Sequence, residues 1–303
     1  MLENKPIAQI VKPTLLITGG AGYLGQHLVA QATGWHVHAT YLHTPPPVFS
    51  GTFHHCDLTN YTHLAHLLAR VRPDVIIHTA CSNQTPANIE AIVPAARHLA
   101  SLASQQAIRL IHLSTDMVFD GTNPPYSEDS PRTPLTPYGY AKARAEEIIQ
   151  ELCPQAVLVR SSLIYGISPL DHQTRWLVGH LDRGEPVTLF TDEIRCPIWV
   201  DNLVSALLEL ATLPYTGILH ITGPQALSRW EFALGMLALV NRQSSRSLFV
   251  ASTIAQAGLT RPRNLTLTVH KAQALLRTPL LSFTEVVQHL QPTEASRLHS
   301  RPF

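Results

Sequence analysis

Short, almost continuously apolar segments recur along the first half of the chain, and segments with the periodicity of helices separate them. A parallel strand that is buried on both faces needs apolar residues in succession. Strands that alternate with helices are typical of a parallel sheet with helices on both sides. The alternation therefore predicts an α/β fold built on a doubly wound parallel sheet. The predicted strands are Leu15–Thr18, Val37–Tyr41, Val75–His78, Ile108–Leu113 and Val157–Arg160.

A glycine-rich turn follows the first predicted strand. Gly19, Gly22 and Gly25 are spaced as TGxxGxxG and lead into a helical segment. In a Rossmann-type sheet these glycines permit a tight turn, let the backbone approach a pyrophosphate and allow close helix packing, while the helix N-terminus supplies N–H donors. The motif predicts dinucleotide binding, and the alternative is a glycine turn without a ligand. The candidate contacts here are Gly19, Gly22, Tyr23, Leu24 and Gly25.

The end of the second predicted strand bears on the choice of cofactor. A carboxylate at this place hydrogen-bonds the ribose of NAD, but the chain has Tyr41-Leu42-His43-Thr44 there. No acid repels a 2′-phosphate, and both His43 and Thr44 can donate a hydrogen bond to one. We therefore expect NADP(H) to be favoured over NAD(H). Asp57 is placed to meet the adenine, although it could instead begin a helix. Further candidate cofactor contacts are Leu58, Thr79 and Ala80.

A tyrosine and a lysine lie four residues apart in the segment Tyr138-Gly139-Tyr140-Ala141-Lys142. This spacing places Tyr138 and Lys142 on one face of a helix. A nearby ammonium favours the phenolate, so Tyr138 could give a proton to a carbonyl oxygen while Lys142 also holds the cofactor ribose. Thr115 ends an upstream strand, where its hydroxyl could hold the same carbonyl. The alternative for Thr115 is a strand-end cap.

The alternation loosens after about residue 166, where glycines and prolines punctuate shorter elements. We predict an NAD(P)-binding Rossmann domain over residues 1–166 and a mainly substrate-binding lobe over residues 167–303. Some segments of the lobe are expected to return to the first domain. In the second half, Asp201 and Ser228 are the predicted N-caps of two helices.

The balance of charge indicates which partners to expect. The chain has 22 Lys and Arg residues and 21 Asp and Glu residues, so it has no field that would gather nucleic acid or an anionic membrane surface. We expect neither as a partner. No apolar signal core lies within residues 1–12 and no run of 18 apolar residues occurs, so the expected location is cytoplasmic.

The cysteines and histidines show no metal-binding pattern. Cys56, Cys81, Cys153 and Cys196 lie far apart without a CxxC spacing, which favours buried thiols in a reducing compartment. The 17 histidines include no HExxH motif. We therefore expect no metal site.

The motifs together resemble those of an extended short-chain dehydrogenase/reductase. Within that group the chain resembles the dTDP-4-dehydrorhamnose reductase family from about residue 13 to residue 290. The segments that carry this narrower resemblance are residues 113–121 (LSTDMVFDG), 125–128 (PYSE), 134–139 (PLTPYG), 195–201 (RCPIWVD) and 261–265 (RPRNL).

The resemblance implies a catalytic trio of Thr115, Tyr138 and Lys142, with hydride passing from the nicotinamide to a sugar C4 ketone and Tyr138 protonating the oxygen. The family usually has a tyrosine that touches the sugar where this chain has Met117. Related dehydratases use an Asp-Glu pair, which Asp116-Met117 lacks, so reduction is favoured over elimination. The implied activity is an NADPH-dependent reductase of a nucleotide-linked 4-keto-6-deoxy sugar.

Two alternatives stay open at this point. One is a short-chain reductase or epimerase that acts on another substrate. The other is a non-catalytic NADP-binding regulatory subunit, since a regulator of methionine adenosyltransferase resembles the same family. Met117 is expected to line the sugar pocket, and Arg195 and Arg261 are candidates to meet a diphosphate, unless each pairs with a surface carboxylate. A homodimer is possible, and neither the nucleotide nor the sugar is defined.

Overall fold

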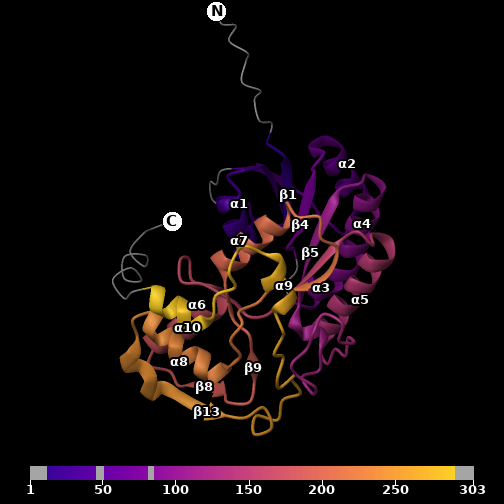
Figure 1. Cartoon of the computed structure of the whole chain (residues 1–303). Coiled ribbons are helices and arrows are strands. Elements are labelled where there is room, and N and C mark those ends of the chain that lie inside the picture. Colours follow the sequence, from indigo (N-terminus) through magenta and orange to yellow (C-terminus); the bar gives the residue numbers. More distant parts are fainter. Residues whose placement is uncertain (1–11, 46–50, 81–84, 291–303) are drawn as a thin grey trace, which may run out of the picture.

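A parallel sheet organises the chain, of which the computed structural model describes residues 12–45, 51–80 and 85–290 (Figure 1). Among these residues the sheet has seven strands in the order β11-β6-β5-β4-β1-β2-β3, and every neighbouring pair is parallel. This order, with β1 in the interior and the chain winding outward on both sides, confirms the doubly wound fold. The strands are β1 (Thr14–Thr18), β2 (His36–Tyr41), β3 (Thr52–His55), β4 (Val75–His78), β5 (Arg109–Thr115), β6 (Val157–Ser161) and β11 (Gly217–His220).

All five strands predicted from the sequence are present, but the prediction omitted the two outermost strands. β3 and β11 lie at the edges of the sheet, and each is only partly buried. An edge strand can carry polar residues, as the sequence Thr-Phe-His-His of β3 does. The continuous apolar pattern of a central strand is therefore missing there.

Helices cover both faces of the sheet, and each face buries its own apolar cluster. Three helices from the first half of the chain cover one face: α2 (Tyr61–Val71), α4 (Ile92–Gln105) and α5 (Pro137–Leu152). On the other face α1 (Tyr23–Gln31) is joined by α7 (Val200–Leu210) and α9 (His270–Leu275). Segments from the second half of the chain thus complete the sheet and its cover, although the domain boundary at residue 166 remains a prediction. The short helix α3 (Pro86–Glu90) precedes α4.

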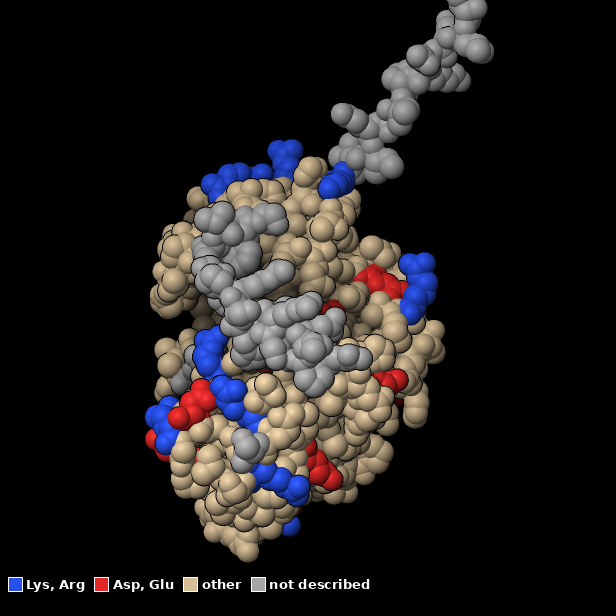
Figure 2. Space-filling model, turned by 90° about the vertical axis from the view of Figure 1, so that its left-hand side faces the viewer, with Lys and Arg blue, Asp and Glu red and all other residues tan. Residues whose placement is uncertain are grey.

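A smaller lobe follows β6 and encloses a third apolar cluster (Figure 1). Short strand pairs tie it together: β10 pairs with β7, β12 with β9, and β13 with β8. On the face shown in Figure 2, acidic and basic side chains are interspersed between broad areas of other residues. The lobe's elements are β7 (Ile164–Tyr165), α6 (His172–Asp182), β8 (Val187–Phe190), β9 (Ile194–Arg195), β10 (Ile198–Trp199), β12 (Leu227–Ser228), α8 (Arg229–Leu239), the 3₁₀ helix η2 (Gln243–Leu248), β13 (Phe249–Ser252) and α10 (Phe283–His289).

The two predicted helix caps have different outcomes. Ser228 is the N-cap of α8 and forms a capping box with Glu231, which confirms that prediction. Asp201 is not a cap: α7 begins at Val200 after the N-cap Trp199. The Asp201 carboxylate instead accepts hydrogen bonds from His27 and Gln31 of α1, and so joins the two helices.

A buried carboxylate fixes α5 against β5 and β6. Glu146 accepts hydrogen bonds from Ser114, from Arg160 (Nη2–Oε2 2.8 Å) and from Arg132 (Nε–Oε2 2.6 Å). Arg160 is also buried, and its guanidinium lies 5.0 Å from the ring centre of Phe119. Burial alone would raise the pKa of the Glu146 carboxyl, but the hydrogen bonds and charges of the arginines hold it below its usual range.

Replacing this carboxylate tests its structural role. Glu146→Gln leaves Arg160 buried without its counter-charge, so the free energy of unfolding should fall by about 3 kcal/mol or more in urea titrations at pH 7. Because the folded-state pKa of Glu146 is lowered, the carboxylate's contribution is complete above its unfolded pKa of about 4.3 and is lost as the pH falls below it. The difference between wild type and variant should therefore shrink in acid.

The neighbouring residue supplies the control. Glu147 pairs with Arg144 on the exposed side of the same helix. Glu147→Gln should change the unfolding free energy by no more than about 0.5 kcal/mol. If the two variants lost the same free energy of unfolding, Glu146 would not be the residue that fixes α5 to the sheet.

Candidate active site

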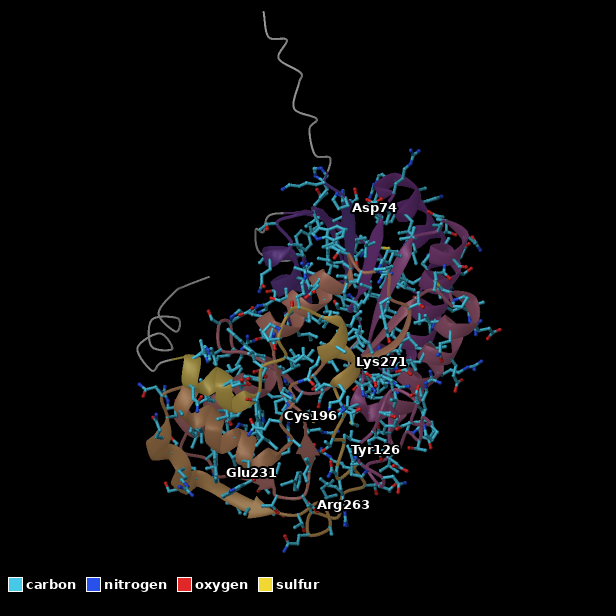
Figure 3. All side chains as sticks on the ribbon, in the orientation of Figure 1. Asp74, Tyr126, Cys196, Glu231, Arg263 and Lys271 are labelled. Atoms are coloured by element: carbon cyan, nitrogen blue, oxygen red, sulfur yellow. The ribbon has the colours of Figure 1, made fainter. Side chains whose placement is uncertain are left out.

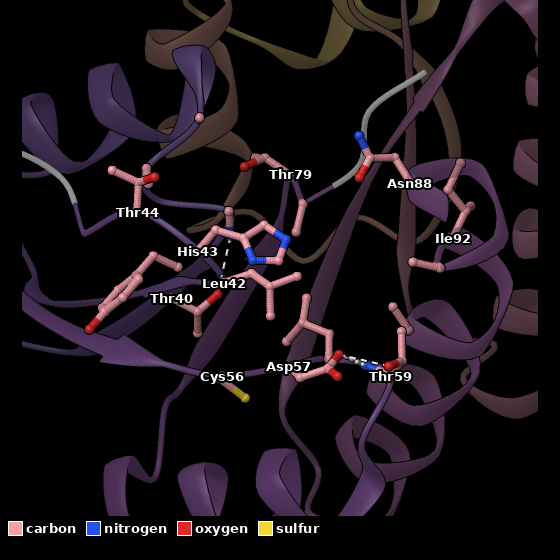
Figure 4. A pocket seen from close by; sticks show the side chains of 18 residues that line it. Thr40, Leu42, His43, Thr44, Cys56, Asp57, Thr59, Thr79, Asn88 and Ile92 are labelled. Atoms are coloured by element: carbon pink, nitrogen blue, oxygen red, sulfur yellow. Dashed lines mark hydrogen bonds between the residues drawn. The ribbon is translucent and has the colours of Figure 1, made fainter. Parts of the chain in front are cut away.

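A cavity of about 390 Å³ opens where β1, β2 and β4 end (Figure 4). Glycines of the turn after β1 form one side of it, and residues that follow β2, β3 and β4 form the others. The cavity thus lies where ligands of open α/β sheets bind, outside the carboxyl ends of the strands. Eight of the predicted cofactor residues line it: Gly19, Gly22, His43, Thr44, Asp57, Leu58, Thr79 and Ala80.

The glycine turn is held by the neighbouring strand β2. The Gly19 N–H donates to Thr40 Oγ1 (3.2 Å), and the Gly20 N–H donates to the Thr40 carbonyl (2.8 Å). Gly19 has a φ of +73°, a conformation that favours glycine. Gly22 is the N-cap of α1, and no side chain caps this helix. The first N–H groups of α1 therefore have no side-chain acceptor and suit a phosphate.

The remaining residues of the motif have other roles. The Tyr23 side chain points toward the lobe, where its hydroxyl donates to the Pro169 carbonyl (3.3 Å). Leu24 is buried in the apolar cluster beneath α1. A Cβ on Gly25 would lie 2.1 Å from the Gly19 oxygen, so this glycine allows the helix to pack on the turn. The structure thus brings only the backbone of Tyr23 and Leu24 near the turn.

The opposite wall of the cavity carries Asp57. Its carboxylate accepts from the Thr59 backbone N–H (2.9 Å) and from Thr59 Oγ1 (2.7 Å), and these bonds lower the pKa of the Asp57 carboxyl. The helix α2 has Asn60 as its N-cap, so Asp57 does not begin that helix. Its free oxygen is placed at the cavity, where it can accept from a base edge or a hydroxyl. No Arg or Lys is among the described residues that line the cavity.

The predicted catalytic residues lie at the end of β5, next to β4. Thr115 is buried, and its Oγ1 donates to Asp116 Oδ1 (3.2 Å) and accepts from the Met117 N–H (3.2 Å). It therefore caps the short turn after β5, as the alternative for this residue predicted. Lys142 of α5 is fully buried, and its Nζ donates to the Leu113 carbonyl (2.7 Å). Tyr138 is partly buried one turn earlier on α5. The fold thus brings Thr115 and Lys142 together at the end of β5. The Tyr138 phenol lies on the same helix as Lys142.

Met117 lies in the 3₁₀ helix η1 (Asp116–Val118), directly after Thr115. Its partly buried side chain packs against the small apolar cluster that contains Val118 and Phe119. It does not line the cavity at the glycine turn.

Arg195 and Arg261 meet at one buried carboxylate. Glu193 Oε1 lies 3.3 Å from Arg195 Nη2, and Glu193 Oε2 lies 3.5 Å from Arg261 Nη1. Arg229 is 3.9 Å from Glu193, and Arg195 Nη1 is 3.5 Å from Asp116 Oδ2. Each predicted arginine therefore pairs with a carboxylate, but Glu193 is buried rather than on the surface. Three guanidinium groups thus surround Glu193, and the charges of Asp116 and Asp171 act on Arg195 and Arg229, respectively.

This group of charges, which we call the arginine cluster, is close to the catalytic end of β5. Ser162 Oγ donates to Asp116 Oδ2 (2.6 Å) and accepts from the Cys196 N–H (3.2 Å). Figure 3 shows Cys196 between the sheet and the lobe. Arg195 Nη1 and Glu193 Oε2 are buried without a hydrogen-bond partner in the described part of the chain.

Sequence reasoning missed four polar residues that surround the site. Glu193 and Arg229 belong to the arginine cluster, and His78 and His112 lie beneath Lys142. The histidines left a signal, because His112 interrupts the apolar sequence of a central strand and His78 ends another. Glu193 left none, since a carboxylate in a loop is ordinary.

Other expectations concern metals, membranes and thiols. In residues 12–45, 51–80 and 85–290, no group of three or more His, Cys, Asp or Glu side chains could hold a metal ion. Over the same ranges, none of the helices has the length and apolarity to cross a bilayer. Cys56, Cys153 and Cys196 are buried free thiols, and Cys81 lies outside the described residues.

Comparisons with known proteins place this geometry in context. The family described as RmlD substrate binding domain matches residues 13–294. A dTDP-4-keto-6-deoxy-D-glucose reductase of Streptomyces niveus is 30% identical over 257 residues, covering 82% of this chain and 86% of the relative. The methionine adenosyltransferase 2 subunit beta of Pongo abelii is 27% identical over 290 residues, covering 86% and 82%.

Solved structures share the fold. The dTDP-4-dehydrorhamnose reductase of Bacillus anthracis in complex with NADP superposes with a TM-score of 0.76 at 22% identity, covering 92% of this chain and 99% of that one. MoeE5 in complex with UDP-glucuronic acid and NAD gives a TM-score of 0.78 at 24% identity, covering 94% and 99%.

The glycine turn allows a direct test of packing. In Gly25→Ala the new Cβ would meet the Gly19 oxygen at 2.1 Å and the Gly20 Cα at 2.8 Å, so the helix must move away from the turn. Unfolding free energy should fall by about 1 to 3 kcal/mol. Gly34→Ala is the control, because its Cβ would meet nothing within 4 Å. Thermal unfolding followed by circular dichroism measures both, and a Gly25→Ala variant as stable as Gly34→Ala would contradict the close packing.

Proposed function

The chain belongs to the family described as RmlD substrate binding domain, and on that premise we propose that it is an NADPH-dependent reductase of a nucleotide-linked 4-keto-6-deoxy sugar. It is an NAD(P)-dependent oxidoreductase of the extended short-chain dehydrogenase/reductase type. The observation that carries the proposal is the position of Lys142 and Thr115 at the strand end beside the cavity of the glycine turn. A dinucleotide in this cavity would extend past the end of β4 to the neighbouring end of β5, where these groups would activate a carbonyl.

The cavity accounts for the proposed cofactor. Gly19, Gly22 and the uncapped start of α1 would hold the pyrophosphate, and Asp57 would accept from the adenosine. His43 and Thr44 would donate to a 2′-phosphate. When bound, the nicotinamide supplies the hydride.

Three side chains would perform the proton chemistry. Thr115 Oγ1 would donate to the substrate carbonyl oxygen, and Tyr138 would deliver the proton to that oxygen as it gains charge. The ammonium of Lys142, one helical turn from Tyr138, favours the phenolate that remains. The Asp116 carboxylate accepts a hydrogen bond from Ser162 and forms an ion pair with Arg195.

The arginine cluster would hold the diphosphate of the nucleotide. Arg195 and Arg261 are the proposed contacts, because a guanidinium fork matches phosphate geometry and stays charged. Met117, beside Thr115, would present an apolar surface where the family has a tyrosine. A substrate hydroxyl left unpaired there would be disfavoured.

A second candidate function is a non-catalytic NADP-binding regulatory subunit. The similarity to the methionine adenosyltransferase 2 subunit beta favours it, since that match also spans most of the chain. The two functions differ in one respect that an assay can measure. A regulator binds NADPH without turning over a keto sugar.

Cofactor binding provides one test. NADPH should bind at least about tenfold more tightly than NADH, because the end of β2 has hydrogen-bond donors and no carboxylate at the ribose. Gly22→Val should abolish binding, since its side chain would enter the cavity at the phosphate position. Fluorescence titration at fixed ionic strength measures both. An NADH preference, or normal NADPH binding by a folded Gly22→Val variant, would refute the respective assignment.

Turnover provides the other test, with dTDP-4-keto-6-deoxy-D-glucose as substrate. Tyr138→Phe removes only the hydroxyl, so kcat should fall about 10²- to 10⁴-fold with NADPH affinity nearly unchanged. Lys142→Met should lose both turnover and affinity, and Thr115→Val should lose mainly turnover. Full activity of Tyr138→Phe would overturn the proton-transfer role. Wild-type protein that binds NADPH but reduces no keto sugar would favour the regulatory function.

A further inference from the structure

Two histidines are buried side by side in the centre of the sheet. His78 of β4 and His112 of β5 are partners in the strand register, with ring centres 4.9 Å apart. They are 3% and 1% exposed, respectively. His78 Nδ1 lies 2.6 Å from Thr18 Oγ1, which fixes the orientation of its ring. The neighbours of the two histidines within β4 and β5 are the apolar residues Ile77, Ile111 and Leu113, so the buried imidazole pair requires an explanation.

His112 is in contact with Lys142. The distance from Lys142 Nζ to His112 Nε2 is 3.1 Å, and both side chains are buried. An ammonium can only donate, so Nε2 must be the accepting nitrogen of a neutral imidazole. Burial and the charge of Lys142 hold the pKa of His112 well below its usual range, which agrees with this protonation state. Lys142 Nζ also donates to the Leu113 carbonyl, which is neutral as well.

A carboxylate lies one turn from Lys142 on the same helix but is committed elsewhere. Glu146 occupies the position four residues after Lys142, where it could form an ion pair along the helix. Its oxygens instead accept from Arg160, Arg132 and Ser114. The Glu146 carboxylate therefore pairs with arginines, and the His112 imidazole is in contact with Lys142.

This arrangement has an energetic cost. His112 Nδ1 has no hydrogen-bond partner among the described residues. A buried polar group without a partner costs about 1 to 3 kcal/mol, which an apolar side chain at residue 112 would avoid. The contact of Nε2 with Lys142 is the one gain in hydrogen bonding that the structure offers in return.

We infer that His112 is a positioning residue, which holds the Lys142 ammonium at the end of β5 without cancelling its positive charge. The inference rests on the proposed function, in which that charge acts on the Tyr138 phenol. A carboxylate at residue 112 would hold the lysine equally well but would neutralise it. A leucine there would not hold it.

The test compares His112→Gln with His112→Glu. Gln and Glu have the same shape, and their Oε1 reaches the position of Nε2, so the two variants differ only in charge. We expect His112→Gln to keep kcat within about threefold of wild type and His112→Glu to lower it about 10²-fold. The dissociation constant for NADPH should change much less than kcat. His112→Leu should lower both turnover and NADPH affinity, as Lys142→Met does.

A second measurement does not depend on turnover. In protein labelled with ¹³C at Cζ of tyrosine, the Tyr138 signal is assigned by its loss in Tyr138→Phe. With His112→Gln the Tyr138 phenol should ionise at a pH about 1 to 3 units lower than with His112→Glu. Equal ionisation in the two variants, or equal kcat, would overturn the role of His112. A wild type that reduces no keto sugar would refute only the proposed function, because the tyrosine titration still decides the inference.

Discussion

The buried carboxylate of Glu146 is the interaction on which the arrangement of the site depends. It binds Arg160 of β6, Arg132 of the preceding loop and Ser114 of β5, and so fixes the rotation and height of α5 on the sheet. Tyr138 and Lys142 lie two turns and one turn earlier on the same face of this helix. The positions of Tyr138 and Lys142 relative to Thr115 therefore depend on the ion pairs of Glu146 as well as on their own contacts.

Ion pairs that hold the fold together also lie next to the proposed reacting groups elsewhere in the molecule. Two buried carboxylates, Glu146 and Glu193, form ion pairs with arginines. Near both lies the end of β5, where the His112 imidazole and the Leu113 carbonyl, both neutral, accept from Lys142. The cavity of the glycine turn lies beside this end, and the arginine cluster joins it through Asp116. In the proposed reduction a positive group would thus face the carbonyl oxygen at the end of β5, and further positive groups would face the diphosphate of the sugar nucleotide at the arginine cluster.

Much of this could be predicted from the sequence because it depends on local patterns. The central strands had continuous apolar residues, and the glycine spacing and the Tyr138–Lys142 pair need only a known strand or helix. The edge strand β3 was missed because partial exposure permits polar residues there. The partner of Lys142 was missed because His112 comes from a strand 30 residues earlier. Glu193 is only two residues from Arg195, but a carboxylate in a loop gives no signal that it is buried. Asp201 was misassigned since its partners on α1 are 170 residues or more away along the chain.

The central claim is that hydride passes to C4 of a nucleotide-linked keto sugar in this site. It is tested most directly with NADPH deuterated at both C4 positions of its nicotinamide and dTDP-4-keto-6-deoxy-D-glucose as acceptor. The account predicts one deuterium in the sugar at C4, seen as a mass increase of one unit and as the loss of the H4 proton signal. A product without deuterium, a product labelled at another carbon, or no product from protein that binds NADPH would contradict it.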